Sequence, residues 1–183
     1  DRYTEKIYGP RDGVNLGWIG DHGSIHYMKG YRETWEEIGR RHGDAFLTII
    51  CDTFMETKSI PLKKVQWQYD TEIDELKRLD IGLMPLYDDL WSRGKCGFKI
   101  IQYLAAGVPA VCTPVGINRD VVENGVNGFW ADTKTDWIEK LSILIKDRDL
   151  RERMGKAGRQ KILDGYTVQA CAPKLMTWLK EII

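Results

Sequence analysis

The sequence lacks several features that assign other chains to a class at once. No apolar run among its 183 residues approaches the length that spans a bilayer. Neither sign of charge is in excess, because 27 Lys and Arg balance 27 Asp and Glu. Any binding of anions must therefore be local, and nothing in the overall charge indicates a nucleic-acid partner.

Metal and disulfide chemistry also find little support. The four cysteines are Cys51, Cys96, Cys112 and Cys171. They form no CxxC pair and match no zinc spacing, so free thiols in a reducing cytoplasm are expected. Two of the three histidines, His22 and His26, stand four apart, but no third ligand accompanies them. The sequence therefore predicts no metal site.

What the sequence does contain is a regular alternation of short apolar runs and stretches with helical spacing. The predicted strands cover residues 14–19, 45–51, 65–69, 80–86, 109–114 and 127–132. The predicted helices cover 24–43, 71–79, 97–106, 118–123, 136–146, 150–163 and 168–183. Nearly uniform apolarity is typical of parallel strands covered on both faces. The pattern predicts an α/β fold with a doubly wound, Rossmann-like parallel sheet.

Composition divides the chain into three parts. Residues 1–13 are polar and contain Gly and Pro, which predicts a linker or an incomplete element. Residues 14–163 form the α/β domain, and 164–183 a terminal helix that Pro173 should kink or interrupt. The chain opens with DRYTEK rather than Met, so we expect it to be a piece of a longer protein.

The most informative segment is the cationic turn and helix RGKCGFKIIQYLAAGVPAV, residues 93–111. Arg93, Lys95 and Lys99 surround a predicted helix N-terminus, where cations are mildly unfavourable. A bound phosphate would explain them, because a glycine-bearing turn into a helix is a ready anion site. The alternative is a solvated basic patch. The turn follows the fourth strand and so faces the crevice where doubly wound sheets bind ligands, which favours the phosphate.

Four segments together resemble one family. They are NLGWIGDHGSIHYM, DIGLMPL, GKCGFKIIQYLAAGVPAV and TPVGINRDVVENGVNGF. In this order they resemble the C-terminal half of retaining glycosyltransferases of the GT-B fold, family 4 (group 1), over roughly residues 14–163. The resemblance implies transfer of a hexosyl group from a nucleoside-diphosphate sugar, with this half binding the donor. It also implies that a separate N-terminal half holds a glycan or lipid acceptor, that the terminal helix packs toward that half, and that this chain alone is inactive.

The resemblance also implies roles for particular residues. The family has two glutamates eight positions apart, which fall here on Gly94 and Gln102, and Gln102 can still bind a ribose hydroxyl. The family's cations after the first strand are replaced by Asp21. We therefore expect the diphosphate to bind at Arg93, Lys95, Gly97, Phe98 and Lys99, with Gly20 and Ser24. The alternative for Ser24 is an ordinary helix N-cap.

The base or sugar pocket is expected to include Tyr69, Gly116, Ile117 and Asn118, although a place in the core is the commoner role for an aromatic such as Tyr69. Because Asp88 and Asp89 are adjacent rather than spaced as Asp-x-Asp, no metal cofactor is expected. The family suggests a cytoplasmic protein, with peripheral association at the inner face of the membrane as an option.

Two other interpretations remain at this point. The departures at Gly94 and Gln102 favour a nucleotide-binding or regulatory module that has lost catalysis. A NAD-dependent dehydrogenase domain is disfavoured, because Gly17, Gly20 and Gly23 form GxxGxxG rather than GxGxxG.

Overall fold

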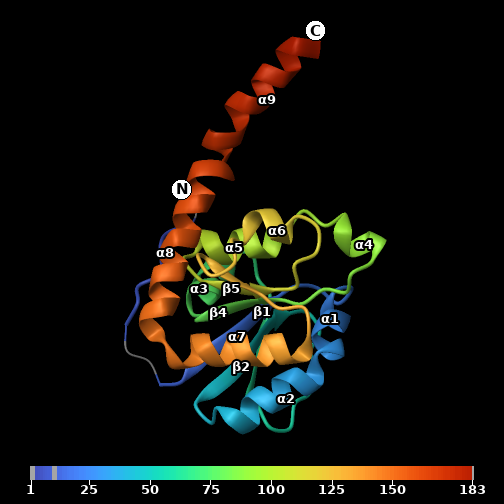
Figure 1. Ribbon diagram of the computed structural model, residues 1–183, viewed down its shortest axis with the longest axis vertical. Helices are drawn as coiled ribbons and strands as arrows, with labels where there is room; N and C mark the ends of the chain where they lie inside the picture. The colour runs from blue at the N-terminus through green and yellow to red at the C-terminus, as the bar shows by residue number, and fades with distance from the viewer. Residues whose placement is uncertain (1–2, 10–11, 183) are drawn as a thin grey trace.

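The computed structural model describes residues 3–9 and 12–182, which fold around one parallel sheet (Figure 1). Its strands are β1 (Val14–Ile19), β2 (Ala45–Cys51), β3 (Leu62–Gln66), β4 (Ile81–Met84), β5 (Ala110–Cys112) and β6 (Gly128–Trp130). They lie in the order β3-β2-β1-β4-β5-β6, with every neighbouring pair parallel. This is the doubly wound order, so the predicted fold class is confirmed.

Helices cover both faces of the sheet. They are α1 (Ile25–Gly30), α2 (Arg32–Arg41), α3 (Glu72–Lys77), α4 (Leu90–Arg93), α5 (Phe98–Ala105), α6 (Asn118–Val121), α7 (Lys134–Lys146), α8 (Arg148–Gly165) and α9 (Val168–Ile182). One apolar core joins the sheet to α1, α2 and α7, and a second joins it to α3, α5 and α6. Both faces are therefore buried, as the apolar strands predict.

The boundaries of the elements differ from the predictions where local signals are weak. β1 and β2 have the predicted bounds, but the third strand lies at Leu62–Gln66 rather than 65–69. It is an edge strand with exposed Lys63 and Lys64, and charged residues on an edge interrupt the apolar pattern. The predicted helix at 24–43 is divided at Tyr31 into α1 and α2.

Two predicted helix signals also need correction. The helix predicted at 136–146 begins earlier, at Lys134, because Thr133 is its N-cap and forms a capping box with Asp136. The break before the terminal helix lies at residues 166–167, and α9 then runs without interruption past Pro173. Pro173 therefore does not interrupt the helix.

The sheet opens at its centre, between β1 and β4. These strands pair only at Leu16–Ile81 and Gly17–Gly82. Beyond this point the buried hydroxyl of Tyr103 accepts from the Ile19 N–H (3.1 Å) and donates to the Leu83 carbonyl (3.2 Å). The α5 side chain thus replaces ladder bonds between the two strands. The winding of the sheet reverses between these same two strands.

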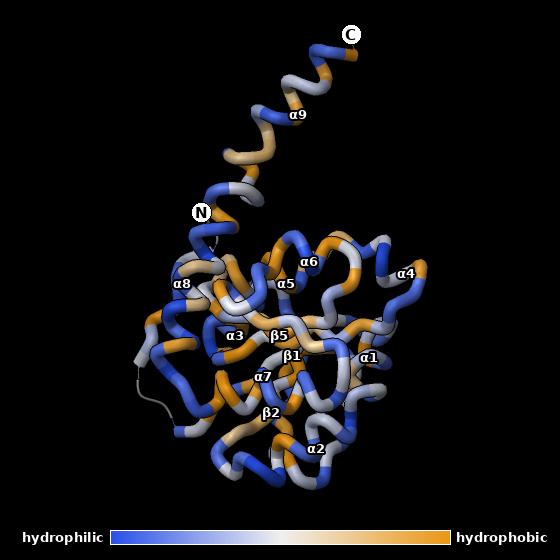
Figure 2. The backbone as a smooth tube through the Cα atoms, in the orientation of Figure 1, coloured by the Kyte–Doolittle hydropathy of each residue, from blue (hydrophilic) through white to orange (hydrophobic). Residues whose placement is uncertain are grey.

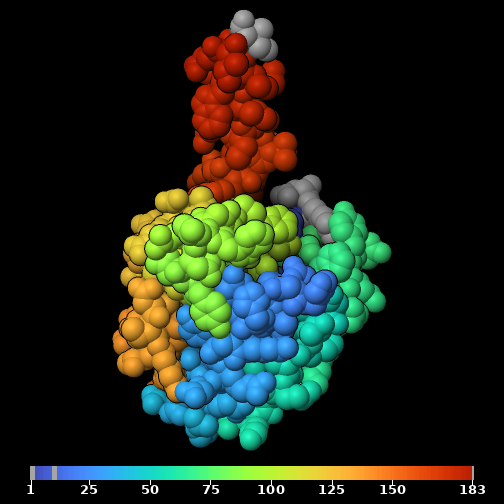
Figure 3. All heavy atoms as spheres, turned by 90° about the vertical axis from the view of Figure 1, so that its right-hand side faces the viewer, coloured from blue at the N-terminus to red at the C-terminus, as the bar shows by residue number. Residues whose placement is uncertain are grey.

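Helix α9 stands away from the domain, as Figures 2 and 3 show. None of its described side chains is buried. Its exposed apolar residues include Leu175, Met176, Trp178, Leu179 and Ile182. No helix in the described part of the chain combines the length and apolarity needed to cross a membrane.

Candidate functional site

A cavity of about 320 Å³ lies where the central strands end and α5 begins. It is lined by Ile19, Gly20, Asp21, Asp52, Trp67, Glu72, Phe98, Lys99 and Gln102. Ile19 ends β1 and Gly20 follows it, Asp52 follows β2, and Trp67 follows β3, so the cavity occupies the carboxyl edge of the sheet. Doubly wound sheets bind their ligands at this edge. Four residues predicted from the sequence line it, namely Gly20, Phe98, Lys99 and Gln102.

The first turn of α5 has the geometry of an anion site. Gly97 precedes it with φ of 67°, a left-handed conformation that favours glycine, and a side chain there would also approach Ile117. The N–H groups at the start of α5 have no partners within the helix. No acidic residue occupies this first turn. The helix therefore presents positive potential beside the cavity.

Lys99 adds a full positive charge at the same place. Its ammonium lies 5.8 Å from the centre of the Trp18 ring. Within the described residues, no carboxylate lies within ion-pair distance of it. Burial lowers the pKa of Lys99, and the nearby charge of Asp21 partly opposes this effect. A half-buried cation without an ion-pair partner is costly, and a bound anion would compensate it.

The other two predicted cations lie outside the cavity. Arg93 donates to both carboxylate oxygens of Asp88, at 2.6 and 3.1 Å, and this bond lowers the pKa of Asp88. The Lys95 ammonium lies over the rings of Tyr27 and Trp91, at 5.3 and 5.8 Å. The three cations are thus separated, and Lys99 alone among them lines the cavity.

The loop after β1 shapes the opposite wall. Gly20 lines the cavity, and a side chain there would overlap the Trp18 ring. Ser24 is buried and does not line the cavity. Its hydroxyl accepts from the Asp21 N–H (3.3 Å) and is 3.1 Å from the Asp21 carboxylate, to which it donates. Although Ser24 is the N-cap of α1, its side chain makes no capping bond. It therefore braces the Asp21 loop.

Gln102 belongs to a buried hydrogen-bond network. The residue is only 4% exposed, and its Nε2 donates to the Tyr3 hydroxyl and to Glu72 Oε1, both at 3.0 Å. The indole N–H of Trp67 donates to Glu72 Oε2 at 2.8 Å. Sequence reasoning missed Glu72, whose only local signal is its place after Thr71 at a helix start. It selected Tyr69, which is 62% exposed and lies outside the cavity lining.

The predicted pocket residues after β5 lie beside the cationic turn, outside the cavity. Gly116 has φ of 54° and lies against the backbone of Arg93, so a side chain there would collide with it. Ile117 lies against Gly97. Asn118 is fully buried and donates to the Thr113 carbonyl at 2.9 Å. Gly116 and Ile117 thus lie against the turn, and none of the three residues lines the cavity.

An imidazole and a carboxylate meet at the rim. His22 Nδ1 lies 2.9 Å from Asp52 Oδ2, and the pair is solvent-exposed. The hydrogen bond to Asp52 raises the pKa of His22 and lowers that of Asp52. This contact joins the loop after β1 to the end of β2. Nowhere in residues 3–9 and 12–182 do three or more His, Cys, Asp or Glu side chains form a metal-binding group.

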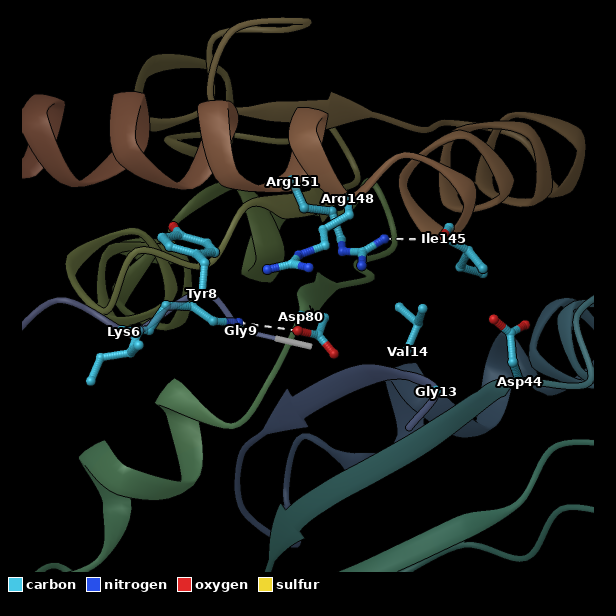
Figure 4. Close-up of a pocket in the computed structure, with 11 residues that line it drawn as sticks. Lys6, Tyr8, Gly9, Gly13, Val14, Asp44, Asp80, Ile145, Arg148 and Arg151 are labelled. Atoms are coloured by element: carbon cyan, nitrogen blue, oxygen red, sulfur yellow. Dashed lines mark hydrogen bonds and ion pairs between the residues drawn. The ribbon is translucent and has the colours of Figure 1, made fainter. Parts of the chain in front are cut away.

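A second cavity, also of about 320 Å³, lies at the opposite edge of the sheet (Figure 4). Here Lys6 forms an ion pair with Asp80 at 3.2 Å. Arg151 donates to the carbonyls of Leu144 and Ile145 at the end of α7. The charged groups of this cavity therefore hold the N-terminal segment beside the start of β4, and α8 against the end of α7.

Comparison with known families identifies the class of the domain. Residues 62–161 match the family of glycosyl transferases group 1. The chain belongs to this family. The match includes α3, the cationic turn and α5, and so covers most of the cavity wall that lies after β2.

Individual relatives are distant. The chain is 28% identical over 79 residues to spore coat protein SA of Bacillus subtilis (strain 168), covering 42% of this chain and 21% of that protein. The structure resembles the C-terminal domain of the group 1 family protein LpcC from Francisella tularensis, with a TM-score of 0.69 at 15% identity, over 85% and 87% of the two chains. It also resembles Anabaena HepE, crystallised with UDP and glucose, with a TM-score of 0.70 at 12% identity, over 92% and 48%.

The fold of the domain therefore matches that of Rossmann-like C-terminal domains of GT-B glycosyltransferases. The chain spans about a fifth of the length of the curated relative that it matches.

Proposed function

We propose that this chain is the donor-binding half of a retaining glycosyltransferase. The enzyme would transfer a hexosyl group from a nucleoside-diphosphate sugar to a glycan or lipid-linked acceptor. The observation that carries the proposal is Lys99, a half-buried cation without an ion-pair partner among the described residues, beside the α5 N-terminus in the central cavity. The site thus offers a full charge and N–H donors to a diphosphate.

The same groups suit the chemistry of the leaving group. When the glycosidic bond to the donor phosphate breaks, negative charge grows on the departing nucleoside diphosphate. Lys99 and the first N–H groups of α5 would stabilise that charge without moving. Gly20 lets the ligand approach the backbone of the opposite wall. The crystal of HepE with UDP and glucose supports this class of donor. No metal ion is part of the proposal.

The acceptor would bind between this domain and an N-terminal half of the full-length protein. The chain spans 37% of TarM and 48% of HepE, with TM-scores of 0.75 and 0.70, which leaves room for such a half in proteins of this shape. The uncovered apolar residues of α9 suit a helix that packs against it. The isolated chain would then bind donor without turnover. We propose a cytoplasmic location for the enzyme, at the inner face of the membrane where the acceptor is a lipid.

Calorimetric titration of the chain with UDP, GDP, ADP and NAD tests the donor site. We expect saturable binding of one nucleoside diphosphate and none of NAD, with the preferred base named by the result. Lys99→Met should weaken that binding, whereas Lys156→Met, on the exposed face of α8, should leave it unchanged. Absence of binding by all three nucleoside diphosphates contradicts the proposal.

A second candidate is a nucleotide-binding module without catalysis. It is favoured by Gly94 and the enclosed Gln102, which stand where the family has two glutamates. Turnover of the preferred donor sugar by the full-length protein distinguishes the two. Release of nucleoside diphosphate dependent on acceptor supports the enzyme, and binding without release at any acceptor tested supports the module.

A further inference from the structure

The cavity contains a buried carboxylate whose partners are all neutral. Glu72 begins α3 and is 9% exposed. Its Oε1 accepts from Gln102 Nε2 (3.0 Å) and the Tyr3 hydroxyl (3.4 Å), and its Oε2 accepts from Trp67 Nε1 (2.8 Å). Within the described residues, no Lys, Arg or His lies within ion-pair distance of it. Burying a carboxylate without a cation is costly, and packing alone does not explain its presence.

The network fixes Glu72 without exhausting its capacity to accept hydrogen bonds. Its donors come from the N-terminal segment, the end of β3 and α5, so the carboxylate is held from three sides. An ionised carboxylate has about four acceptor sites, and three are in use. Gln102 directs its Nε2 hydrogens to Tyr3 and Glu72, which leaves the amide oxygen as its remaining acceptor. The cavity wall thus combines two acceptors that suit two hydroxyl donors.

The position of this pair relative to Lys99 matches the connectivity of a nucleotide. Lys99 and Gln102 are three residues apart on α5, a rise of about 4.5 Å along one face. In a nucleoside diphosphate, a single methylene joins the ribose ring to the first phosphate. A diphosphate at the start of α5 therefore brings the ribose hydroxyls toward Glu72 and Gln102, which line the same cavity.

We infer that Glu72 is the carboxylate that binds the ribose diol of the donor, together with the amide oxygen of Gln102. The inference rests on the proposed function and assigns a residue of α3 to that site. A carboxylate is the side chain that accepts strongly from a ribose 2′-hydroxyl. Trp67 and Tyr3 are positioning residues, because they hold the carboxylate through hydrogen bonds. The negative charge that the family's glutamate would carry at position 102 is thus supplied by Glu72 of α3.

The test compares ribose with deoxyribose ligands. The chain is titrated with the nucleoside diphosphate that binds best among UDP, GDP and ADP, with its 2′,3′-dideoxy form, and with pyrophosphate. The unaltered chain should prefer the ribose form at least tenfold. Glu72→Gln should remove most of that preference, lowering affinity for the ribose form about 10- to 50-fold. Its affinities for the dideoxy form and pyrophosphate should change less than twofold. Asp74→Asn, on the exposed side of α3, is the matched control.

Each outcome bears on one proposal. Absence of binding by the unaltered chain overturns the proposed function, whereas binding without a ribose preference overturns only the role of Glu72. A Glu72→Gln chain that keeps the preference, or loses equal affinity for all three ligands, also overturns it. Thermal unfolding of each variant shows that the fold is intact. If Glu72→Gln does not fold, Glu72→Asp takes its place. A ribose preference that is present in the unaltered chain and falls in Glu72→Asp supports the role of Glu72, and an unchanged preference overturns it.

Discussion

The two edges of the sheet contain cavities of similar volume, about 320 Å³ each, but they treat buried charge in opposite ways. At the amino edge, Lys6 is 5% exposed and pairs with Asp80. At the carboxyl edge, Lys99 has no ion-pair partner among the described residues, and burial lowers its pKa. A charge compensated within the chain serves the fold. A charge left uncompensated beside a helix N-terminus serves a ligand.

The largest expected effect comes from breaking the compensated pair. Lys6→Met removes the ammonium and leaves the Asp80 carboxylate in its enclosed position, so the free energy of unfolding should fall by about 3 kcal/mol. Urea denaturation measures the change. Lys156→Met, which breaks a solvent-exposed pair with Glu152, should leave the free energy of unfolding almost unchanged. Equal effects of the two variants would contradict the distinction between the edges.

Lys99→Met, unlike Lys6→Met, should weaken ligand binding without lowering the stability of the fold. Nucleoside diphosphate binding should weaken by about 1–3 kcal/mol, because a charge-assisted contact is lost. The melting temperature should rise or stay unchanged, since the variant no longer buries an uncompensated ammonium. Calorimetry and thermal unfolding measure the two quantities on the same sample. Unchanged affinity removes Lys99 from the site, and a large loss of stability would show that it serves the fold.

The opening of the sheet between β1 and β4 gives a smaller effect. Tyr103→Phe removes the hydroxyl that joins Ile19 and Leu83, which leaves two buried backbone groups without this partner. The free energy of unfolding should fall by about 1–2 kcal/mol. Tyr31→Phe is a suitable comparison, because its hydroxyl donates to the Leu86 carbonyl at 3.3 Å in a partly buried position. Its loss should be less than half as large, by the same denaturation measurement.

The sequence predicted the parts of this arrangement that are encoded locally. Apolar runs predicted β1 and β2 with their bounds, the turn before α5 indicated Lys99 and Phe98, and the family resemblance indicated Gln102. These features depend on neighbouring residues. The edge strand β3 was misplaced because Lys63 and Lys64 interrupt its apolar pattern.

The remainder of the site depends on contacts that no local pattern reveals. Glu72 lies 30 residues before Gln102, and the two meet only because β3 and β4 lie on either side of β1 and β2. For the same reason, the sequence grouped three cations that the fold separates: Arg93 turns to Asp88 and Lys95 to aromatic rings. Closeness in sequence predicted that the three cations bind one anion together, but the fold determines which of them lacks an ion-pair partner.

The smallest expected effect is a dependence of binding on pH. The pKa of Lys99 is lowered in the free chain because burial disfavours the ammonium, and a bound diphosphate should raise it by supplying negative charge. Affinity for the diphosphate should therefore be constant at pH values below the pKa of Lys99 in the free chain. It should fall as the pH rises through that pKa, since only the ammonium form of Lys99 attracts the ligand. The decline should begin at lower pH than an ordinary lysine, with a pKa near 10.4, would produce. Calorimetry between pH 7 and pH 10 measures it, and Lys99→Arg should be flat over that range because arginine stays charged. A decline that persists in Lys99→Arg would assign the titration to another group.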